Sequence, residues 1–231
     1  MNHISFFLLQ LFFRVCVNIG ELSDLLIQQA ITSVVKVSDE FEHEDVEVDD
    51  VCYGVFSIVN LTAKKKNMEC IRQIHSLLLD KCKEVCAESD YGTFKNILED
   101  MEKHVGLIIS ERLVNIPAQI AVPLYAGLSH DIKKYKALGQ PFDFAYYIII
   151  SKLIVYDSGP VEDRVHYANP EEEIIAESAV MSFDYPVSNE NDSGAWTDEG
   201  NEGRRKRRVM LIPASKYDEM YLKMVSEISQ A

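Results

Sequence analysis

Two long apolar runs dominate the pattern of hydrophobic and polar positions along the chain. Residues 105–109 are apolar or glycine throughout, and the stretch YYIIISKLIVY (146–156) is interrupted only by Ser151 and Lys152. Such a run is typical of a strand buried on both faces, and a strand of this kind needs helices above and below its sheet. The pattern therefore predicts an α/β fold: a single domain over 1–231, with a central mixed β-sheet flanked by helices on both faces.

Shorter patterns place the remaining elements of the fold. Segments rich in aromatic and β-branched residues predict further strands over 34–37, 53–59, 180–187 and 209–212. Apolar positions spaced by three and four, together with capping residues, predict helices near the N-terminus, after Asn18, over 68–86, around 91–103, from 117 to about 135, from 169 and from 215.

The order of these elements suggests how they connect. A strand, two helices and a second strand follow one another from 53 to 109, and for such a crossover we expect a parallel pairing with a right-handed connection. Ser110, Glu111 and Arg112 then form a predicted polar turn. Pro123 cannot donate a backbone hydrogen bond, so the helix expected after Pro117 should kink there or begin late.

Two segments are predicted to be loops. Residues 39–50, within an acidic loop over 38–51, contain eight acidic side chains in twelve positions, a density that no core accommodates. These side chains are Asp39, Glu40, Glu42, Glu44, Asp45, Glu47, Asp49 and Asp50. The second segment is a polar loop over 186–207, which leads into the basic run Arg204, Arg205, Lys206, Arg207 and Arg208. This run fits either a nuclear-import signal or a solvated loop end that balances nearby acids.

The net charge narrows the range of partners. A formal charge of −14 argues against direct binding to duplex DNA or to an anionic membrane, because both need a basic surface. The same charge suits a basic protein partner, since long-range attraction raises the encounter rate and penalises wrong partners. We therefore expect a protein partner rather than nucleic acid or membrane.

The apolar N-terminus resembles a signal peptide only superficially. No Lys or Arg precedes the apolar run, Gln10 interrupts it, and Arg14 stands where small residues of a cleavage site would lie. The run is also too short to span a bilayer. Its residues Phe6, Leu9 and Phe13, with the neighbours Phe12 and Val17, fit the core-facing side of a helix.

No metal or cofactor site is expected. The five cysteines form no ligand or disulfide framework, so they are interpreted as small core residues of a reducing compartment. The acidic segment 39–50 lacks the glycine that a calcium loop of the EF type needs at its sharp turn.

A catalytic centre is not expected either. The sequence contains no G-x-S-x-G, Walker, G-x-G-x-x-G or H-E-x-x-H motif, and its six histidines are scattered. Ser110, Glu111 and Arg112 are the best candidates, because they end a buried strand where ligands of α/β proteins often bind. A structural role, in which Glu111 and Arg112 fix the strand-to-helix turn, is the favoured alternative.

The spacing Ser110-Glu111-Arg112-x-x-Asn115-x-Pro117 resembles the signature of the BCCIP family of eukaryotic nuclear adaptor proteins. Four further segments resemble the family in the same order: ELSDLLIQQ (21–29), YGVFSIVNLT (53–62), NPEEEIIAESAVMSFDY (169–185) and RVMLIPASKYDEM (208–220). The resemblance implies a fold similar to that of the GCN5-related acetyltransferases, without their cofactor loop. It also implies that the acidic N-terminal tail and first strand of the family are absent from this sequence.

The resemblance implies a function as well. It implies a non-enzymatic nuclear protein, with some cytoplasmic population, that escorts a basic large-subunit ribosomal protein and so supports 60S assembly and nuclear export. The first alternative is a scaffold in DNA repair and cell-cycle control, which binds a recombination mediator and a cyclin-dependent-kinase inhibitor. A degenerate acyltransferase is the second alternative.

Overall fold

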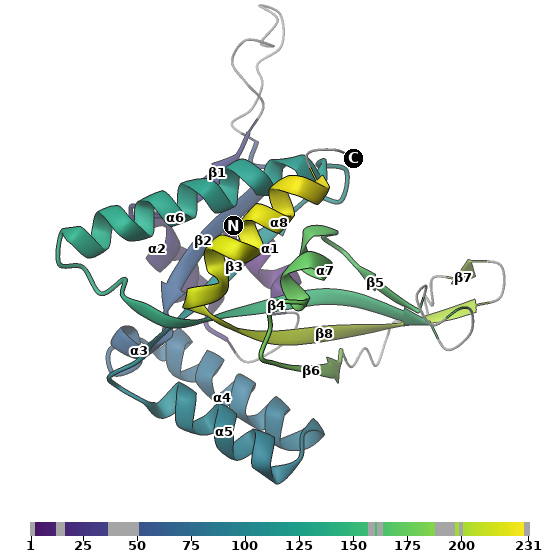
Figure 1. Cartoon of the computed structure of the whole chain (residues 1–231), viewed down its shortest axis with the longest axis horizontal. Helices are drawn as coiled ribbons and strands as arrows, with labels where there is room; N and C mark the ends of the chain where they lie inside the picture. Colours follow the sequence, from purple (N-terminus) through teal and green to yellow (C-terminus); the bar gives the residue numbers. More distant parts are fainter. Residues whose placement is uncertain are drawn as a thin grey trace, which may run out of the picture.

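The computed structural model describes residues 3–12, 17–36, 51–156, 160, 164–187, 197–198 and 201–228. A sheet in the order β1-β2-β3-β4-β8-β6 forms its centre, with β5 paired to β4 and β7 paired to β8 (Figure 1). The strands are β1 (Ser33–Val35), β2 (Gly54–Asn60), β3 (His104–Arg112), β4 (Phe144–Tyr156), β5 (Val165–Tyr167), β6 (Met181–Pro186), β7 (Thr197–Asp198) and β8 (Asn201–Pro213).

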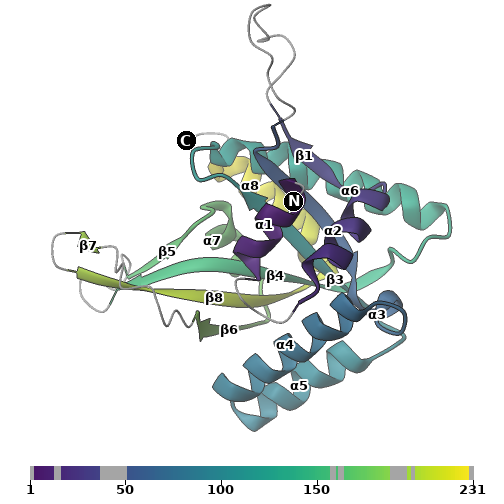
Figure 2. The same ribbon diagram turned by 180° about the vertical axis from the view of Figure 1, so that it is seen from behind.

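Helices cover both faces of this sheet (Figures 1 and 2). One face carries α1 (His3–Leu11), α2 (Ile19–Gln28), α4 (Glu69–Val85) and α5 (Glu88–Glu99). The opposite face carries α6 (Ala121–Ala137), α7 (Glu171–Ala176) and α8 (Tyr217–Ile228). The short helix α3 (Leu61–Lys64) follows β2, and single 3₁₀ turns at Ala118–Ile120 and Ala214–Lys216 precede α6 and α8. The predicted α/β architecture with a mixed sheet is thus confirmed.

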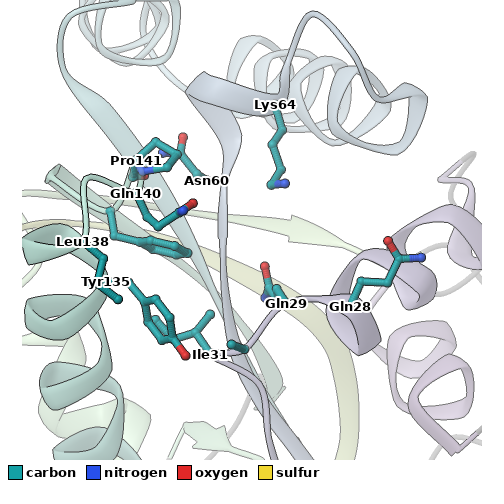
Figure 3. Close-up of a pocket in the computed structure, with 11 residues that line it drawn as sticks. Gln28, Gln29, Ile31, Asn60, Lys64, Tyr135, Leu138, Gln140 and Pro141 are labelled. Atoms are coloured by element: carbon teal, nitrogen blue, oxygen red, sulfur yellow. Dashed lines mark hydrogen bonds between the residues drawn. The ribbon is translucent and has the colours of Figure 1, made fainter.

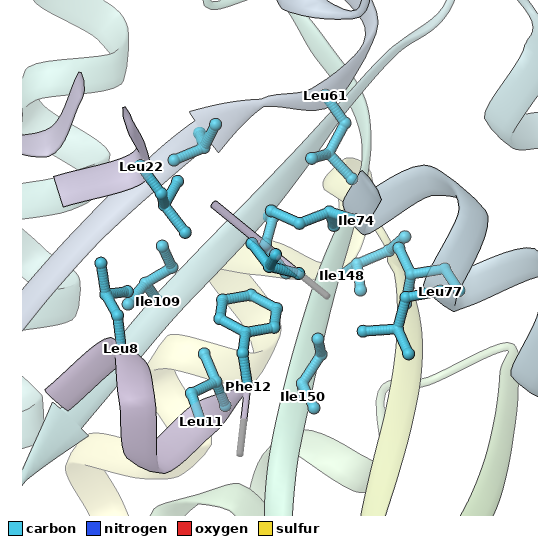
Figure 4. Packing of buried hydrophobic residues seen from close by; sticks show 14 of the residues in the cluster. Leu8, Leu11, Phe12, Leu22, Leu61, Ile74, Leu77, Ile109, Ile148 and Ile150 are labelled. Atoms are coloured by element: carbon cyan, nitrogen blue, oxygen red, sulfur yellow. The ribbon is translucent and has the colours of Figure 1, made fainter. Parts of the chain in front are cut away.

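Alternate residues of the strands feed two hydrophobic clusters, one on each face. Ile109 of β3 and Ile148 of β4 pack against Leu8, Phe12 and Ile74 of the first helical layer (Figure 4). Their neighbours Ile108 and Ile149 point to the second layer and join the other cluster. Both strands are therefore buried on both faces, as their apolar runs predict.

The expected parallel pairing of the strands around 53–59 and 105–109 is wrong. β2 pairs with β3 in antiparallel orientation, with Asn60 opposite Gly106. The physical reason is that α4 and α5 pack against each other as a helical hairpin, which returns the chain to the end of the sheet that it left. The parallel pair in this sheet is β3 with β4, and α6 forms its connection.

Details at the helix starts agree with the sequence. The side chain of Asn18 caps α2 by accepting a hydrogen bond from the backbone N–H of Glu21 at 3.1 Å. After Pro117 the chain forms one 3₁₀ turn, and α6 begins at Ala121. Pro123 therefore lies in the first turn, where its missing N–H removes no helical hydrogen bond. Of the two predicted alternatives, a kink or a late start of the helix, the late start is confirmed.

Two predicted irregular segments are strands instead. β3 continues through Ser110, Glu111 and Arg112, which are buried rather than exposed in a turn. β8 begins at Asn201, so residues 201–207 of the predicted polar loop belong to the sheet. In these segments the side chains of Glu111, Arg112, Arg207 and Arg208 find partners inside the fold. The acidic residues 38–50 and the loop residues 188–196 lie outside the described residues. Within the described part of the chain, no helix is long and apolar enough to cross a membrane.

Candidate functional site

The three polar residues that end β3 are directed to both sides of the sheet. Strand alternation places Ser110 and Arg112 on the face covered by α6, α7 and α8, and it places Glu111 on the face covered by α1 and α2. Gly54 of β2 lies opposite Arg112, and a Cβ at this position would lie 2.9 Å from the Cβ of Arg112. A glycine in β2 therefore provides the space in which the Arg112 side chain starts.

Arg112 forms a bidentate ion pair with Glu171 of α7. Its Nη2 donates to Glu171 Oε2 at 2.7 Å and its Nη1 donates to Glu171 Oε1. The side chains of Arg112 and Glu171 are only 5% and 0% exposed, so water does not compete for this pair. Burial lowers the pKa of Arg112, but the hydrogen bond and negative charge of Glu171 outweigh burial and raise the pKa overall.

Glu111 is paired on the opposite face of the sheet. Lys152 of β4 donates from its Nζ to Glu111 Oε2, and the Glu111 side chain is 2% exposed. Burial raises the pKa of Glu111, and the positive charges of Lys152 and Arg207 oppose that rise without cancelling it. The pair connects β3 to β4 beyond Ile108 and Ile149, which are the last paired residues of these two strands.

Glu172 differs from its neighbour Glu171. It is buried and accepts a hydrogen bond from Asn169 Nδ2 at 3.0 Å, and Asn169 Nδ2 also lies 3.4 Å from the carbonyl oxygen of Ser110. Burial raises the pKa of Glu172 to about 8, and the charges of Glu171 and Glu111 contribute to the rise. A neutral, protonated Glu172 is therefore the favoured form at neutral pH.

The basic run 204–208 is part of β8, which lies between β4 and β6 in the sheet. Arg207 is buried and donates from Nη2 to the Gln10 carbonyl at 2.8 Å and from Nε to the Leu11 carbonyl at 3.3 Å. It thereby supplies a cation and two donors to the C-terminal end of α1, which has no basic residue in its own last turn. Burial lowers the pKa of Arg207.

Arg208 is engaged on the other face of β8. Its Nε and Nη2 donate to the two carboxylate oxygens of Asp184 at 2.7 and 2.8 Å, and its Nη1 donates to the Tyr167 hydroxyl at 2.5 Å. The hydrogen bonds to Asp184 raise the pKa of Arg208 well above its ordinary value. Within the run, Arg204 and Arg205 are the exposed residues. An import receptor that reads all five side chains would have to extract β8 from the sheet.

The structure thus brings together part of the predicted residues and separates others. Glu111, Arg112, Arg207 and Arg208 form a set of ion pairs and polar contacts around β3, β4, β8 and α7, which we call the ionic network, and Ser110 contributes its backbone carbonyl. Asn115 and Pro117 lie in the exposed turn between β3 and α6. The acidic residues from Asp39 to Asp50 lie outside the described residues.

Sequence reasoning missed the partners of the ionic network. Acids in the first turn of a helix usually lie at the surface, where they interact favourably with the helix dipole, yet Glu171 and Glu172 are both buried. A signal was present, because Glu171 stands three and four positions before the apolar Ile174 and Ile175 and so shares their side of the helix. Nothing in the sequence around Lys152 or Asp184 indicates that Lys152 pairs with Glu111 or that Asp184 pairs with Arg208.

The ionic network has the chemistry of a structural connection. Its ion pairs connect α7 to β3 and link neighbouring strands, and Arg207 joins the N-terminal layer to the sheet through the backbone carbonyls of α1. Lys152 and Arg207 also line a hollow of about 340 Å³ beside Gln10 and His166. No group of three or more His, Cys, Asp or Glu side chains within the described residues could hold a metal ion.

With this geometry in place, comparison with known proteins decides the family. The BCCIP family model matches residues 1–175 of this sequence. The chain belongs to the BCCIP family. "BRCA2 and CDKN1A-interacting protein" from Homo sapiens is 36% identical over 237 residues, which cover 95% of this chain and 74% of the relative. Its counterpart from Bos taurus is 35% identical over 235 residues, with 95% and 76% covered.

More distant BCCIP-family relatives come from fungi. "Protein BCP1" from Gibberella zeae is 26% identical over 216 residues, which cover 87% of this chain and 71% of the relative. The crystal structure of BCP1 from Saccharomyces cerevisiae superimposes with a TM-score of 0.65 over 98% of this chain and 83% of that chain. At 20% identity, this last similarity concerns the fold alone.

Proposed function

We propose that this BCCIP-family protein is a non-enzymatic nuclear binding protein that acts as a chaperone or escort for a basic large-subunit ribosomal protein. In this role it would support 60S ribosome assembly and nuclear export. A newly made ribosomal protein carries a dense positive charge before ribosomal RNA neutralises it. An acidic surface can shield that charge temporarily and release it to the stronger polyanion.

The distribution of charge is the observation that carries the proposal. Inside the fold, the buried or half-buried cations Arg112, Lys152 and Arg208 pair with the acidic side chains of Glu171, Glu111 and Asp184. These three pairs carry no net charge, so the formal net charge of −14 belongs to the side chains outside them. A strongly acidic exterior supports a basic macromolecule as the cargo.

An aggregation assay tests the proposal. A purified basic large-subunit ribosomal protein is diluted from high salt into physiological salt, and light scattering is followed with and without an equimolar amount of this protein. We expect suppression of scattering and a one-to-one complex by size-exclusion chromatography. An unrelated protein of similar size and net charge is the control, and equal suppression by that protein would contradict a specific escort role.

A second candidate function rests on the names of the relatives. Proteins that are 35% and 36% identical to this chain are named as interacting with BRCA2 and CDKN1A. A scaffold in DNA repair and cell-cycle control would bind such recombination and cell-cycle regulators without protecting a ribosomal protein. Quantitative pull-downs of both partner classes from nuclear extract, followed by mass spectrometry of the full-length protein's complexes, separate the two roles.

The proposed similarity to the GCN5-related acetyltransferase fold leaves a degenerate acyltransferase as a third alternative. Those enzymes hold the coenzyme A pyrophosphate on a glycine-rich loop, and the chain between Asn115 and Pro123 has prolines where glycines would be needed. We therefore propose a binding protein rather than an enzyme. Saturable binding of acetyl-CoA in isothermal titration calorimetry would overturn this choice.

A further inference from the structure

A hollow of about 330 Å³ lies at the end of β2 and just before the start of β4, whereas the basic run of β8 pairs with the other end of β4. Figure 3 shows the residues that line this hollow. Three separate segments form it: the residues after α2, the junction of β2 with α3, and the C-terminal end of α6 with the following loop. The lining residues are Gln28, Gln29, Ala30, Ile31, Asn60, Lys64, Tyr135, Leu138, Gln140, Pro141 and Phe142. We call this hollow the α6 pocket. Its volume is at the small end of the range of about 300–1,000 Å³ that is usual for ligand sites.

The wall of the α6 pocket is fixed by backbone structure. Gly139 adopts a φ of +75°, and it ends α6 in a Schellman motif. In this motif the N–H of Gln140 donates to the Tyr135 carbonyl at 3.0 Å, and the N–H of Gly139 donates to the Lys136 carbonyl at 3.0 Å. The loop that follows is tied to β2, because Asn60 Nδ2 donates to the Pro141 carbonyl at 2.5 Å. The pocket is therefore formed before any ligand arrives.

The floor of the pocket is apolar, and its rim is basic. Ile31, Tyr135 and Phe142 supply apolar surface, and Leu138 stands 65% exposed at the edge. Lys64 reaches over the opening from α3 (Figure 3). On α6, Lys134 Nζ lies 5.3 Å from the centroid of the ring of Tyr135, which lines the pocket.

The positive charge of this rim is not neutralised within the fold. Lys64 and Lys134 form no ion pair with any of the described residues. Lys65 and Lys66 continue the basic run next to Lys64. The acid that follows Phe142, Asp143, is paired with Lys136 at 2.7 Å. A basic rim of this kind is unexpected on a protein whose net charge is −14.

We propose that the α6 pocket binds a short acidic peptide segment of a partner protein, with one apolar or aromatic side chain of that segment inserted in the pocket. The rim lysines attract the flanking carboxylates, and the apolar floor buries the inserted side chain. The exposed amides of Gln28 and Gln140 can hydrogen-bond the peptide backbone.

A short peptide fits these observations better than RNA does. An RNA strand would extend past the few lysines of the rim, and there the net charge of −14 would repel its phosphates. A short peptide with a few carboxylates contacts only the rim lysines. The apolar floor also rewards a hydrophobic side chain. This site has the opposite charge preference to the proposed cargo surface and does not depend on the proposed chaperone role. Together, two such surfaces would let the protein hold a basic cargo and an acidic partner at once.

Fluorescence anisotropy tests the proposal on the full-length protein. The probe is a fluorescein-labelled peptide with a central phenylalanine that is flanked by glutamates on both sides. We expect saturable binding that weakens with salt, and a loss of affinity of roughly tenfold or more for Lys64→Glu and for Leu138→Ser. Replacement of the peptide's phenylalanine by alanine should give a similar loss.

Matched surface variants provide the controls. Lys83→Glu reverses an exposed lysine on α4, and Leu222→Ser changes a leucine of α8 that is 66% exposed, close to the exposure of Leu138. Both controls should bind the probe within about twofold of wild type, and circular dichroism should show that all four variants are folded.

Three results would overturn the proposal. One is the absence of saturable probe binding by the wild-type protein up to about millimolar concentration. Another is equal loss of affinity in the control and pocket variants. The third is a labelled oligouridylate that binds more tightly than the peptide and responds to Lys64→Glu but not to Leu138→Ser, which would make the rim an RNA-binding surface.

Discussion

Glu171 and Glu172 are sequence neighbours in α7 that meet opposite electrostatic surroundings. Both carboxylate oxygens of Glu171 accept hydrogen bonds from the buried Arg112, so the negative charge of Glu171 is needed to balance the guanidinium charge. Glu172 has an amide as its hydrogen-bond partner, and burial holds it in the neutral form at neutral pH. The same substitution should therefore have opposite effects at the two positions.

Glu171→Gln should destabilise the protein strongly. The variant leaves the Arg112 guanidinium buried without a counter-charge, and the loss of one partner of such a pair costs roughly 3–5 kcal/mol. Urea denaturation followed by circular dichroism measures the difference. Glu172→Gln is the matched control, because it keeps the oxygen that accepts from Asn169. Equal losses for the two variants would show that the charge of Glu171 is not what stabilises α7.

Glu172→Gln should also change how stability depends on pH. The pKa of Glu172 is raised from an ordinary value of 4.5 to about 8, so the folded state binds the proton more tightly than the unfolded state. The resulting stabilisation is complete below about pH 4.5 and is lost as pH rises through about 8. Glutamine has no proton to lose, so relative to wild type the variant should gain on the order of a few kcal/mol between about pH 5 and pH 8.5. A pH-independent difference between the two proteins would contradict a buried neutral Glu172.

At the scale of elements, β3 lies in the interior of the sheet and β1 lies at its edge. Ile109 of β3 is 0% exposed and packs in the cluster beneath α1 and α4. Ile109→Ala, like Ile149→Ala in β4, should lower the free energy of unfolding by roughly 2–5 kcal/mol in urea denaturation. Val34→Ala in β1, where the side chain is 43% exposed, should cost less than about 1 kcal/mol.

The sequence predicts well those elements whose pattern of apolar residues is regular along their whole length. The spacing of apolar residues over 68–86 predicts α4, and the apolar runs predict the central positions of β3 and β4, since both depend on local pattern alone. The pairing of β2 with β3 depends instead on how α4 and α5 turn back on each other. The spacing of apolar residues does not show that two helices form a hairpin. The predicted parallel pairing of β2 with β3 was therefore wrong.

The N-terminal half of β8 was missed for a different reason. Consecutive arginines and lysines are typical of a solvated loop. Because all five residues of the run 204–208 are basic, they lack the alternation of apolar and polar residues that would predict a strand. Arg207 is nevertheless buried against the C-terminal carbonyls of α1, and Arg208 is held by Asp184. These partners lie 197 and 24 positions away in the chain, so only the folded structure brings them together. The same distance dependence explains why Ser110, Glu111 and Arg112 could be singled out while their partners could not.

At the scale of the whole molecule, charge is sorted between interior and exterior. The cations Arg112, Lys152 and Arg208 are neutralised inside the fold by Glu171, Glu111 and Asp184, so these six side chains add no net charge to the exterior. Attraction of a basic cargo should thus come from exterior acids. At 0.15 M ionic strength it decays over about 8 Å, so it acts mainly on the encounter of the two proteins.

Neutralisation of the acids in 39–50 by Asp/Glu→Asn/Gln changes should slow association with the basic ribosomal protein more than it speeds dissociation. Exposed carboxylates steer the encounter, whereas contacts that form after docking set the off-rate. Stopped-flow or surface-plasmon measurements at low and physiological salt give both rate constants. The variant's on-rate should be lower and less dependent on salt than the wild-type on-rate.

A second neutralised variant separates segment 39–50 from net charge. Glu88, Asp90 and Glu99 are exposed on α5 and can be changed to their amides without loss of a described ion pair. If segment 39–50 receives the cargo, its variant should slow association more per charge removed than the α5 variant does. Equal effects per charge would mean that the whole exterior steers the cargo. A wild-type on-rate and salt dependence in the 39–50 variant would mean that another surface holds the ribosomal protein, because a segment that neither attracts nor retains the cargo cannot be its binding site.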